Sequence, residues 1–163
     1  EFLLAEAVQR NEFSVGGTAE DHYKKAVAAS LYRWGIDDGA NGFDFNLFYN
    51  QPSVSLATAD DKIERIMEQK WVSGWFGIEA WFDWRRTGYP AFRTGPVTEF
   101  APPNSNALPL RFIYPLPNQD EKYLVNYNAA VERLEKTLYV PQAQSKDHHY
   151  SKMWLLQGTG RPY

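Results

Sequence analysis

The chain has 163 residues, 44% of them hydrophobic and 16% aromatic, and a formal net charge of −3. This length predicts one domain with a core of its own, and the acidic balance without a Lys/Arg cluster argues against a nucleic-acid surface. Because these residues include no cysteine and no apolar run of bilayer length, they exclude disulfides, thiol chemistry and a membrane-spanning helix.

Residues 1–35 are typical of a helical hairpin. Residues 1–10 favour a helix because they contain no helix breaker. After a double glycine that predicts a turn, Thr18 and Asp21 have the spacing of a capping box and begin a second helix. Apolar residues at steps of three and four, from Tyr23 to Trp34, predict the buried face of this helix, which continues as far as Gly35. We expect the two helices to pack antiparallel like a tetratricopeptide unit, although a single copy shows no sequence period.

The next segment, residues 35–57, is rich in turn dipeptides and contains an aromatic group. Alternating residues from Phe43 to Leu47 predict a short strand or an extended excursion. Exposed aromatic rings stack on sugar rings or line peptide grooves, although internal packing is their more common role. The candidate ligand contacts of this group are Phe43, Phe45, Phe48 and Tyr49. A second candidate surface is the Pro-rich loop at 91–109.

Residues 58–90 form the centre of the sequence. The run Thr58-Ala59-Asp60-Asp61 repeats the capping pattern, with Thr58 leading it. Two helices, or one broken helix, are expected from about Ile63 to Thr87. Gly88 favours the left-handed conformation that ends a helix, and Pro90 forbids its continuation.

Charged and aromatic side chains alternate in this central stretch. Asp83 and Arg86 are three residues apart and share a helix face. Glu79 lies four residues before Asp83, so the two carboxylates repel each other unless a cation lies between them. We interpret the group as a structural ion-pair and aromatic cluster, with a ligand-contacting role as the alternative. Its members are Lys70, Trp71, Glu79, Trp81, Asp83, Arg85 and Arg86.

No catalytic residue, cofactor or metal site is predicted. Glu79 and Asp83 resemble a glycosidase carboxylate pair, but neighbouring arginines would keep both ionised and disable a general acid. The histidines are His22 and the adjacent pair His148 and His149, and adjacent residues do not face one site from a helix.

The last segment, residues 91–163, reads as a loop, a helix and a tail. The prolines of 91–109 predict an irregular loop, and Leu110–Tyr114 predicts a short extended piece. A third capping pattern, Asn118-Gln119-Asp120-Glu121, begins another helix. The tail shows little periodicity, and three of its residues are expected to pack back on the chain: Trp154, Leu155 and Leu156.

Four segments carry a resemblance to SusD/RagB-family proteins. The most specific is the run Gln69-Lys70-Trp71 with Glu79-Ala80-Trp81-Phe82-Asp83-Trp84-Arg85-Arg86-Thr87-Gly88-Tyr89-Pro90, which is similar to a signature near the end of those proteins, in their SusD-like subgroup. The other three are Glu1–Ala7, Leu110–Pro115 and the helix start at Glu121. The chain departs from the family pattern at Phe43–Tyr49 and after Lys152, where Leu155 follows Trp154 in place of a paired tryptophan.

The resemblance implies a mostly α fold, a tetratricopeptide-like helical-repeat core with long irregular loops. It also implies that residues 1–163 are the C-terminal portion of a single SusD-like domain, with the signal peptide and a lipid-bearing cysteine in a preceding part outside this sequence. The implied function is non-catalytic capture of oligosaccharides, or of oligopeptides in some members. The implied place is the outer face of the outer membrane, as the lid of a SusC-type TonB-dependent transporter.

Two functions of other classes remain open on the sequence alone. An α-helical glycoside hydrolase would release new reducing ends from its substrate. A plain repeat scaffold would bind a protein partner and retain neither glycan nor peptide.

Overall fold

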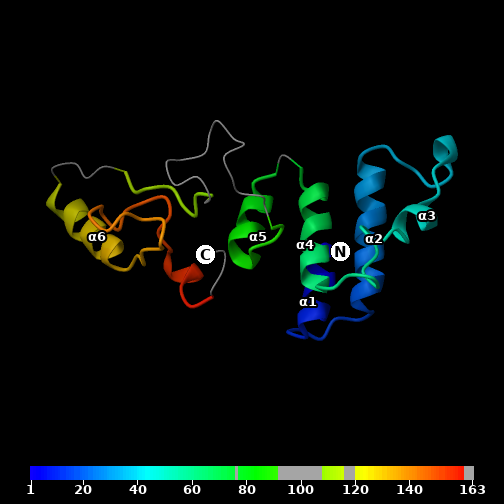
Figure 1. The fold of residues 1–163 in the computed structure, drawn as a ribbon, viewed down its shortest axis with the longest axis horizontal. Helices are drawn as coiled ribbons and strands as arrows, with labels where there is room; N and C mark the ends of the chain where they lie inside the picture. Colours follow the sequence, from blue (N-terminus) through cyan, green and yellow to red (C-terminus); the bar gives the residue numbers. More distant parts are fainter. Residues whose placement is uncertain (76, 92–107, 116–119, 160–163) are drawn as a thin grey trace. The chain divides into compact units, whose positions relative to one another are not determined.

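The computed structural model describes residues 1–75, 77–91, 108–115 and 120–159 (Figure 1). Its described residues form six α-helices and two short 3-10 turns, with a single isolated antiparallel bridge, so the mostly α prediction is confirmed. None of the described helices combines the length and the apolar character needed to cross a membrane. The chain divides into two compact units, Glu1–Pro90 and Ala91–Tyr163, and each is described by itself.

The first unit begins with the predicted hairpin, formed by α1 (Phe2–Arg10) and α2 (Ala19–Arg33). The capping box is confirmed, because the Asp21 N–H donates to the Thr18 hydroxyl at 3.1 Å and the Thr18 N–H donates to the Asp21 carboxylate at 3.1 Å. These bonds satisfy amide groups that the first helical turn leaves without intrahelical partners.

A second hairpin follows, formed by α4 (Lys62–Ser73) and α5 (Glu79–Thr87). The cap of α4 is Asp61, whose carboxylate accepts from two backbone amides of the first turn. Thr58 was expected to begin this capping pattern, but its hydroxyl donates to backbone carbonyls of the preceding loop instead. The end of α5 is as predicted, with Gly88 in the left-handed conformation at φ 77°.

The two hairpins stack on each other. Within the first unit, α1 packs against α2 and α4, α2 also packs against α4, and α4 packs against α5. Figure 1 shows α2, α4 and α5 side by side in this order. This pattern is the one expected of consecutive helix-turn-helix repeats, where each repeat buries its apolar face on its neighbour. The tetratricopeptide-like core is therefore present as two helix-turn-helix repeats, both within the first unit. The sequence indicated only the first of these repeats.

Between the hairpins, the expected strand at Phe43–Leu47 is replaced by the short helix α3 (Phe45–Tyr49). The alternation of apolar residues was misleading because Asp44 caps a helix here, and its carboxylate accepts from the Leu47 N–H at 2.9 Å. This helix adds Tyr49 to the core of the first unit, where the Tyr23 ring lies at 6.1 Å between centroids.

The core of the first unit is built from α1, α2, α3, α4 and the loop before α4. Its fully buried centre includes Ala5, Tyr23, Leu56, Ile66 and Met67. Trp34 was expected on the buried face of α2, but it is 54% exposed at the end of that helix.

The second unit contains α6 (Glu121–Glu132), which begins at the Asp120 cap. Residues 108–115 have no regular secondary structure, and the Leu110 N–H donates to the His149 carbonyl at 2.8 Å. Of the three tail residues expected to pack inward, Leu156 is buried, whereas Trp154 and Leu155 are exposed. The Pro-rich loop lies mainly outside the described residues, as do the first two residues of the expected third capping pattern.

Candidate functional site

The central ion pair of the first unit joins α5 to α1. The Arg86 guanidinium donates to both carboxylate oxygens of Glu6, at 2.5 Å and 2.8 Å. Arg10, one turn after Glu6 on α1, donates to the same carboxylate at 2.8 Å. Glu6 is only 5% exposed, so two guanidinium groups compensate one buried charge.

The pKa of Glu6 reflects this arrangement. Burial acts to raise the pKa of Glu6, but the hydrogen bonds and charges of Arg86 and Arg10 outweigh burial and hold it below its usual value. The hydrogen bond to Glu6 in turn raises the pKa of Arg86. The pair is therefore ionised throughout the physiological range.

Asp83 extends the ion-pair chain to α4. It accepts from Lys70 at 2.7 Å and from Arg86 at 3.0 Å. The five charges alternate in sign from Arg10 to Glu6, Arg86, Asp83 and Lys70. Sequence spacing indicated the Asp83–Arg86 contact, but it did not indicate Glu6. The available signal was an acidic residue inside the apolar run of α1.

The remaining members of the cluster form separate contacts. The Arg85 guanidinium lies 4.0 Å from the centre of the Trp81 ring, and Trp71 packs edge-on against Trp75 at 4.8 Å. Glu79 is exposed and makes no ion pair with any described residue. Asp83, in contrast, contacts both Lys70 and Arg86, so its carboxylate is held between two cations.

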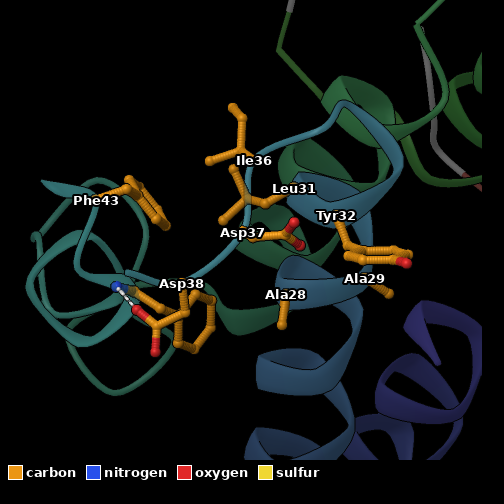
Figure 2. A pocket seen from close by; sticks show the side chains of 9 residues that line it. Ala28, Ala29, Leu31, Tyr32, Ile36, Asp37, Asp38 and Phe43 are labelled. Atoms are coloured by element: carbon orange, nitrogen blue, oxygen red, sulfur yellow. Dashed lines mark hydrogen bonds between the residues drawn. The ribbon is translucent and has the colours of Figure 1, made fainter. Parts of the chain in front are cut away.

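A hollow of about 450 Å³ lies beside the C-terminal half of α2, where the loop after α2 returns towards α3 (Figure 2). Its size falls within the range of about 300–1,000 Å³ that is common for small-molecule pockets. The lining residues are Ala28, Ala29, Leu31, Tyr32, Ile36, Asp37, Asp38, Phe43 and Phe45. The hollow is formed within the first unit alone.

The four aromatic candidates from the sequence have different places around this hollow. Phe43 and Phe45 line it, whereas Phe48 packs behind Phe43 with 5.8 Å between ring centroids. Tyr49 stacks on Phe45 at 5.9 Å, is only 3% exposed, and donates its hydroxyl to Glu20 at 3.3 Å. The structure therefore places Phe43 and Phe45 at the surface of the hollow and the other two residues in the packing that supports it.

Among the lining residues, only Phe43 and Phe45 were predicted from the sequence as ligand contacts, and the exposed residues that follow Leu31 were not. Tyr32 is 71% exposed, and Ile36 and Asp37 follow it in the loop after α2. In the view of Figure 2, Asp37 is drawn between Phe43 on one side and Tyr32 on the other. The only sequence signal was that Tyr32 lies off the apolar face of α2, next to Leu31, which faces the core.

The histidines serve structural contacts. His22 joins the Glu1 carboxylate at 2.8 Å through Nδ1 and the Gly16 carbonyl at 2.6 Å through Nε2. In the second unit, Asp147 lies next to His148 in the chain. Its carboxylate accepts hydrogen bonds from the Arg111 guanidinium at 2.6 Å and from the Tyr127 hydroxyl at 3.2 Å. Across the described residues, no group of three or more acidic, histidine or cysteine side chains is arranged to hold a metal.

Several solved structures are similar to the chain, and three of them illustrate the likeness. A SusD homolog from Bacteroides fragilis has a TM-score of 0.69 and 27% identity, covering 96% of this chain and 34% of its own. A SusD-like protein from Bacteroidetes AC2a has a TM-score of 0.68 and 22% identity, with coverages of 94% and 28%. A SusD homolog from Bacteroides vulgatus has a TM-score of 0.63 and 21% identity, with coverages of 96% and 34%. The last two likenesses show the fold alone.

The chain spans about a third of the length of these structural relatives. No curated protein matches it. The model of the SusD-like family described as "Starch-binding associating with outer membrane" matches residues 1–115, which is 115 of the 163 residues. The chain therefore belongs to this SusD-like family of starch-binding, outer-membrane-associated proteins.

Proposed function

We propose that the protein captures oligosaccharides at the outer face of the outer membrane and does not transform them. The observation that carries this proposal is the family match over residues 1–115, which include both stacked hairpins and the hollow between α2 and α3. Capture needs a shaped surface with a few placed polar groups, and a rigid helical scaffold supports such a surface.

The ligand surface in this proposal is the hollow walled by Phe43 and Phe45. Their rings are partly exposed, and the packing of Phe48 and Tyr49 behind them holds them in place. An aromatic wall that is fixed before the ligand arrives loses little conformational entropy on binding. A flat sugar ring then covers apolar surface that is otherwise exposed to water.

The charges of the central cluster favour binding over catalysis. A hydrolytic pair needs one carboxyl group that is protonated near neutral pH, together with a second one across the scissile bond. Asp83 has a cation on each side, and Glu79 projects from α5 without a charged partner among the described residues. In this proposal the cluster is a structural wall between α4, α5 and α1.

The proposed partner is a SusC-type TonB-dependent barrel, over which the protein acts as a lid, with a lipid anchor on a cysteine outside this sequence. Opening of the lid would expose the ligand surface, and closure would commit the ligand to the barrel. Family membership supports this role, and the association with the outer membrane is part of the family's description. Co-purification of a barrel transporter with the tagged protein from outer membranes tests it, and recovery of the protein without any barrel counts against it.

Calorimetry of the purified protein against oligosaccharide and oligopeptide panels, with a reducing-end assay on the same samples, tests the capture function. We expect binding of oligosaccharides, no new reducing ends, and at least tenfold weaker binding in Phe43→Ala. Phe13→Ala is the matched control, because Phe13 is exposed and does not line the hollow.

Each other result points to a different function. Retention of oligopeptides alone would make the protein a peptide-binding lid. New reducing ends that depend on Glu79 would make it a hydrolase. Stable co-purification with a protein partner, without retention of glycan or peptide, would make it a repeat scaffold.

A further inference from the structure

We propose that the hollow beside α2 is a subsite for an uncharged sugar residue, with Tyr32 as its stacking platform and Asp37 as the acceptor for its hydroxyl groups. This inference rests on the proposed function, because it names the ligand class and two specificity-determining residues of the same surface. It is carried by three features of the hollow: an open aromatic ring, a carboxylate without a described partner, and the sign of the lining charges.

The open ring belongs to Tyr32, which projects from the last turns of α2. Its exposed fraction of 71% is far above that of the other tyrosines of the first unit that pack in the core, Tyr23 and Tyr49. Its neighbours in the lining on the same helix are Ala28 and Ala29, whose methyl groups leave the ring uncovered. A flat apolar ring with a polar hydroxyl at its edge suits a sugar, which has an apolar face and a polar rim.

The available acceptor is the Asp37 carboxylate. The backbone carbonyl of Asp37 accepts from the Ala40 N–H at 3.1 Å, which fixes the turn. Its side chain makes no hydrogen bond or ion pair with any residue that the structure describes. By contrast, Asp38 accepts from the Phe45 N–H at 2.9 Å and is engaged in holding the loop. An ionised carboxylate has two acceptor oxygens, so Asp37 suits two vicinal hydroxyl groups.

The lining charges select against acidic sugars. The lining contains two acidic side chains, Asp37 and Asp38, and none of its described residues is a lysine or an arginine. Lys24 lies close to the aromatic wall, but its Nζ is held 5.9 Å from the centre of the Phe45 ring and donates to Asn46 at 3.3 Å. A uronate or a sulfate placed in the hollow would face like charges without a lining cation to offset them.

The test is calorimetry with two panels of matched chain length, unsubstituted neutral oligosaccharides (maltooligosaccharides among them) and oligogalacturonates. The neutral ligands should bind at least tenfold more tightly than the acidic ones. Tyr32→Ala should weaken neutral binding about tenfold, whereas Tyr32→Phe keeps the ring and should bind like wild type. Asp37→Asn should weaken neutral binding about fivefold and narrow the gap to the acidic ligands, because it removes the charge and keeps one acceptor.

Two variants outside the hollow are the controls. Trp34→Ala removes an exposed aromatic ring two residues after Tyr32, and Asp60→Asn removes an exposed carboxylate before α4. Neither should change binding of either panel. Circular dichroism and melting temperatures establish that all variants fold.

The possible failures separate the two proposals. If the acidic ligands bind as tightly as the neutral ones or more tightly, the proposed charge selectivity is wrong, but the proposed capture of oligosaccharides still holds. Neutral binding that is unchanged in both Tyr32→Ala and Asp37→Asn places the sugar site elsewhere and overturns this inference alone. Failure of every oligosaccharide to bind overturns the proposed function itself.

Discussion

Arg86 on α5 donates two hydrogen bonds to the Glu6 carboxylate on α1, and the two residues are 80 positions apart in the chain. The contact ties the last helix of the second hairpin to the first helix of the first. It places the carboxylate of Glu6 in the interior, where loss of its partners is costly.

Removal of the Arg86 side chain is therefore expected to destabilise the protein. Arg86→Ala leaves Glu6 with Arg10 alone and takes one cation from Asp83. We expect a loss of about 2 kcal/mol, below the value for a fully buried pair because Arg86 is 43% exposed and Arg10 remains. Urea unfolding measures this as a lower midpoint with an unchanged slope.

Arg33→Ala is the matched control for this prediction, since Arg33 is an exposed arginine in the last turn of α2. It should change the free energy of unfolding by no more than about 0.5 kcal/mol. Equal stabilities for Arg86→Ala and Arg33→Ala would show that the contact with Glu6 contributes nothing to folding.

The buried hydroxyl of Tyr23 gives a second prediction. It donates to the Val54 carbonyl at 2.5 Å in the core of the first unit. Tyr23→Phe keeps the ring but leaves that carbonyl without its donor, at an expected cost of about 1–2 kcal/mol. Tyr32→Phe removes an exposed hydroxyl and should leave thermal stability unchanged. A Tyr23→Phe melting temperature equal to that of wild type would mean that water or another group replaces the hydroxyl.

His22 makes the stability of the first hairpin depend on pH. Both ring nitrogens face oxygen acceptors, the Glu1 carboxylate and the Gly16 carbonyl, so the doubly protonated imidazolium satisfies both. The hydrogen bond to Glu1 is the main cause that raises the pKa of His22 above its usual value, and the bond to Gly16 adds to it. Asp21 and Lys25 are the other charged neighbours, and Lys25 opposes the shift.

The sign of the pH effect follows from this raised pKa. The contribution of His22 is fully present below about pH 6.5, the pKa of an unfolded histidine, and is lost as the pH rises through the higher pKa of the folded state. Melting temperatures between pH 5 and pH 9 should fall with rising pH more steeply in wild type than in His22→Gln. Burial lowers the pKa of His148, so this second histidine contributes in the opposite direction, and comparison with His22→Gln removes its effect. Parallel pH profiles for the two proteins would contradict the prediction.

The second unit has its own buried ion pair, between Arg111 and Asp147 at 2.6 Å. Both side chains are almost fully buried, and Asp147 also accepts from the Tyr114 N–H and the Tyr127 hydroxyl. Asp147→Ala would leave the Arg111 charge buried without its carboxylate, and we expect a loss of about 3–5 kcal/mol.

The preceding residue in the chain offers a control. Lys146 pairs with Glu132, but that pair is exposed, so Lys146→Ala should cost at most about 1 kcal/mol. Denaturant unfolding followed by tyrosine and tryptophan fluorescence separates the two variants. Similar losses in both would mean that Asp147 is accessible to water in solution.

Sequence reasoning succeeded where a structure depends on neighbours three or four residues away. Thr18 with Asp21 and the stop at Gly88 are decided by hydrogen bonds within one helical turn, and both were predicted. It failed at Phe43–Leu47, where alternation indicated a strand, because the single carboxylate of Asp44 is enough to cap a helix. The same competition between local signals moved the cap of α4 from Thr58 to Asp61.

The candidate ligand surface shows the same division. Aromatic density drew attention to the segment from Phe43 to Tyr49, but burial decides which of these rings can meet a ligand. Tyr49 turns into the core while Tyr32, which no pattern singled out, remains at the surface. The burial of each ring depends on how α2 packs against α3. That packing cannot be predicted from local patterns in a single sequence.

By itself, the sequence determined the helical character of this protein, the ends of most of its helices and its resemblance to a family, because these depend on local bonding and local order. Only the tertiary structure decided that Glu6 is the partner of Arg86, that two hairpins stack, and that α2 and the loop before α3 enclose a hollow. Those features join residues distant in the chain, and their energy comes from burial and charge pairing that exist only after the helices have packed.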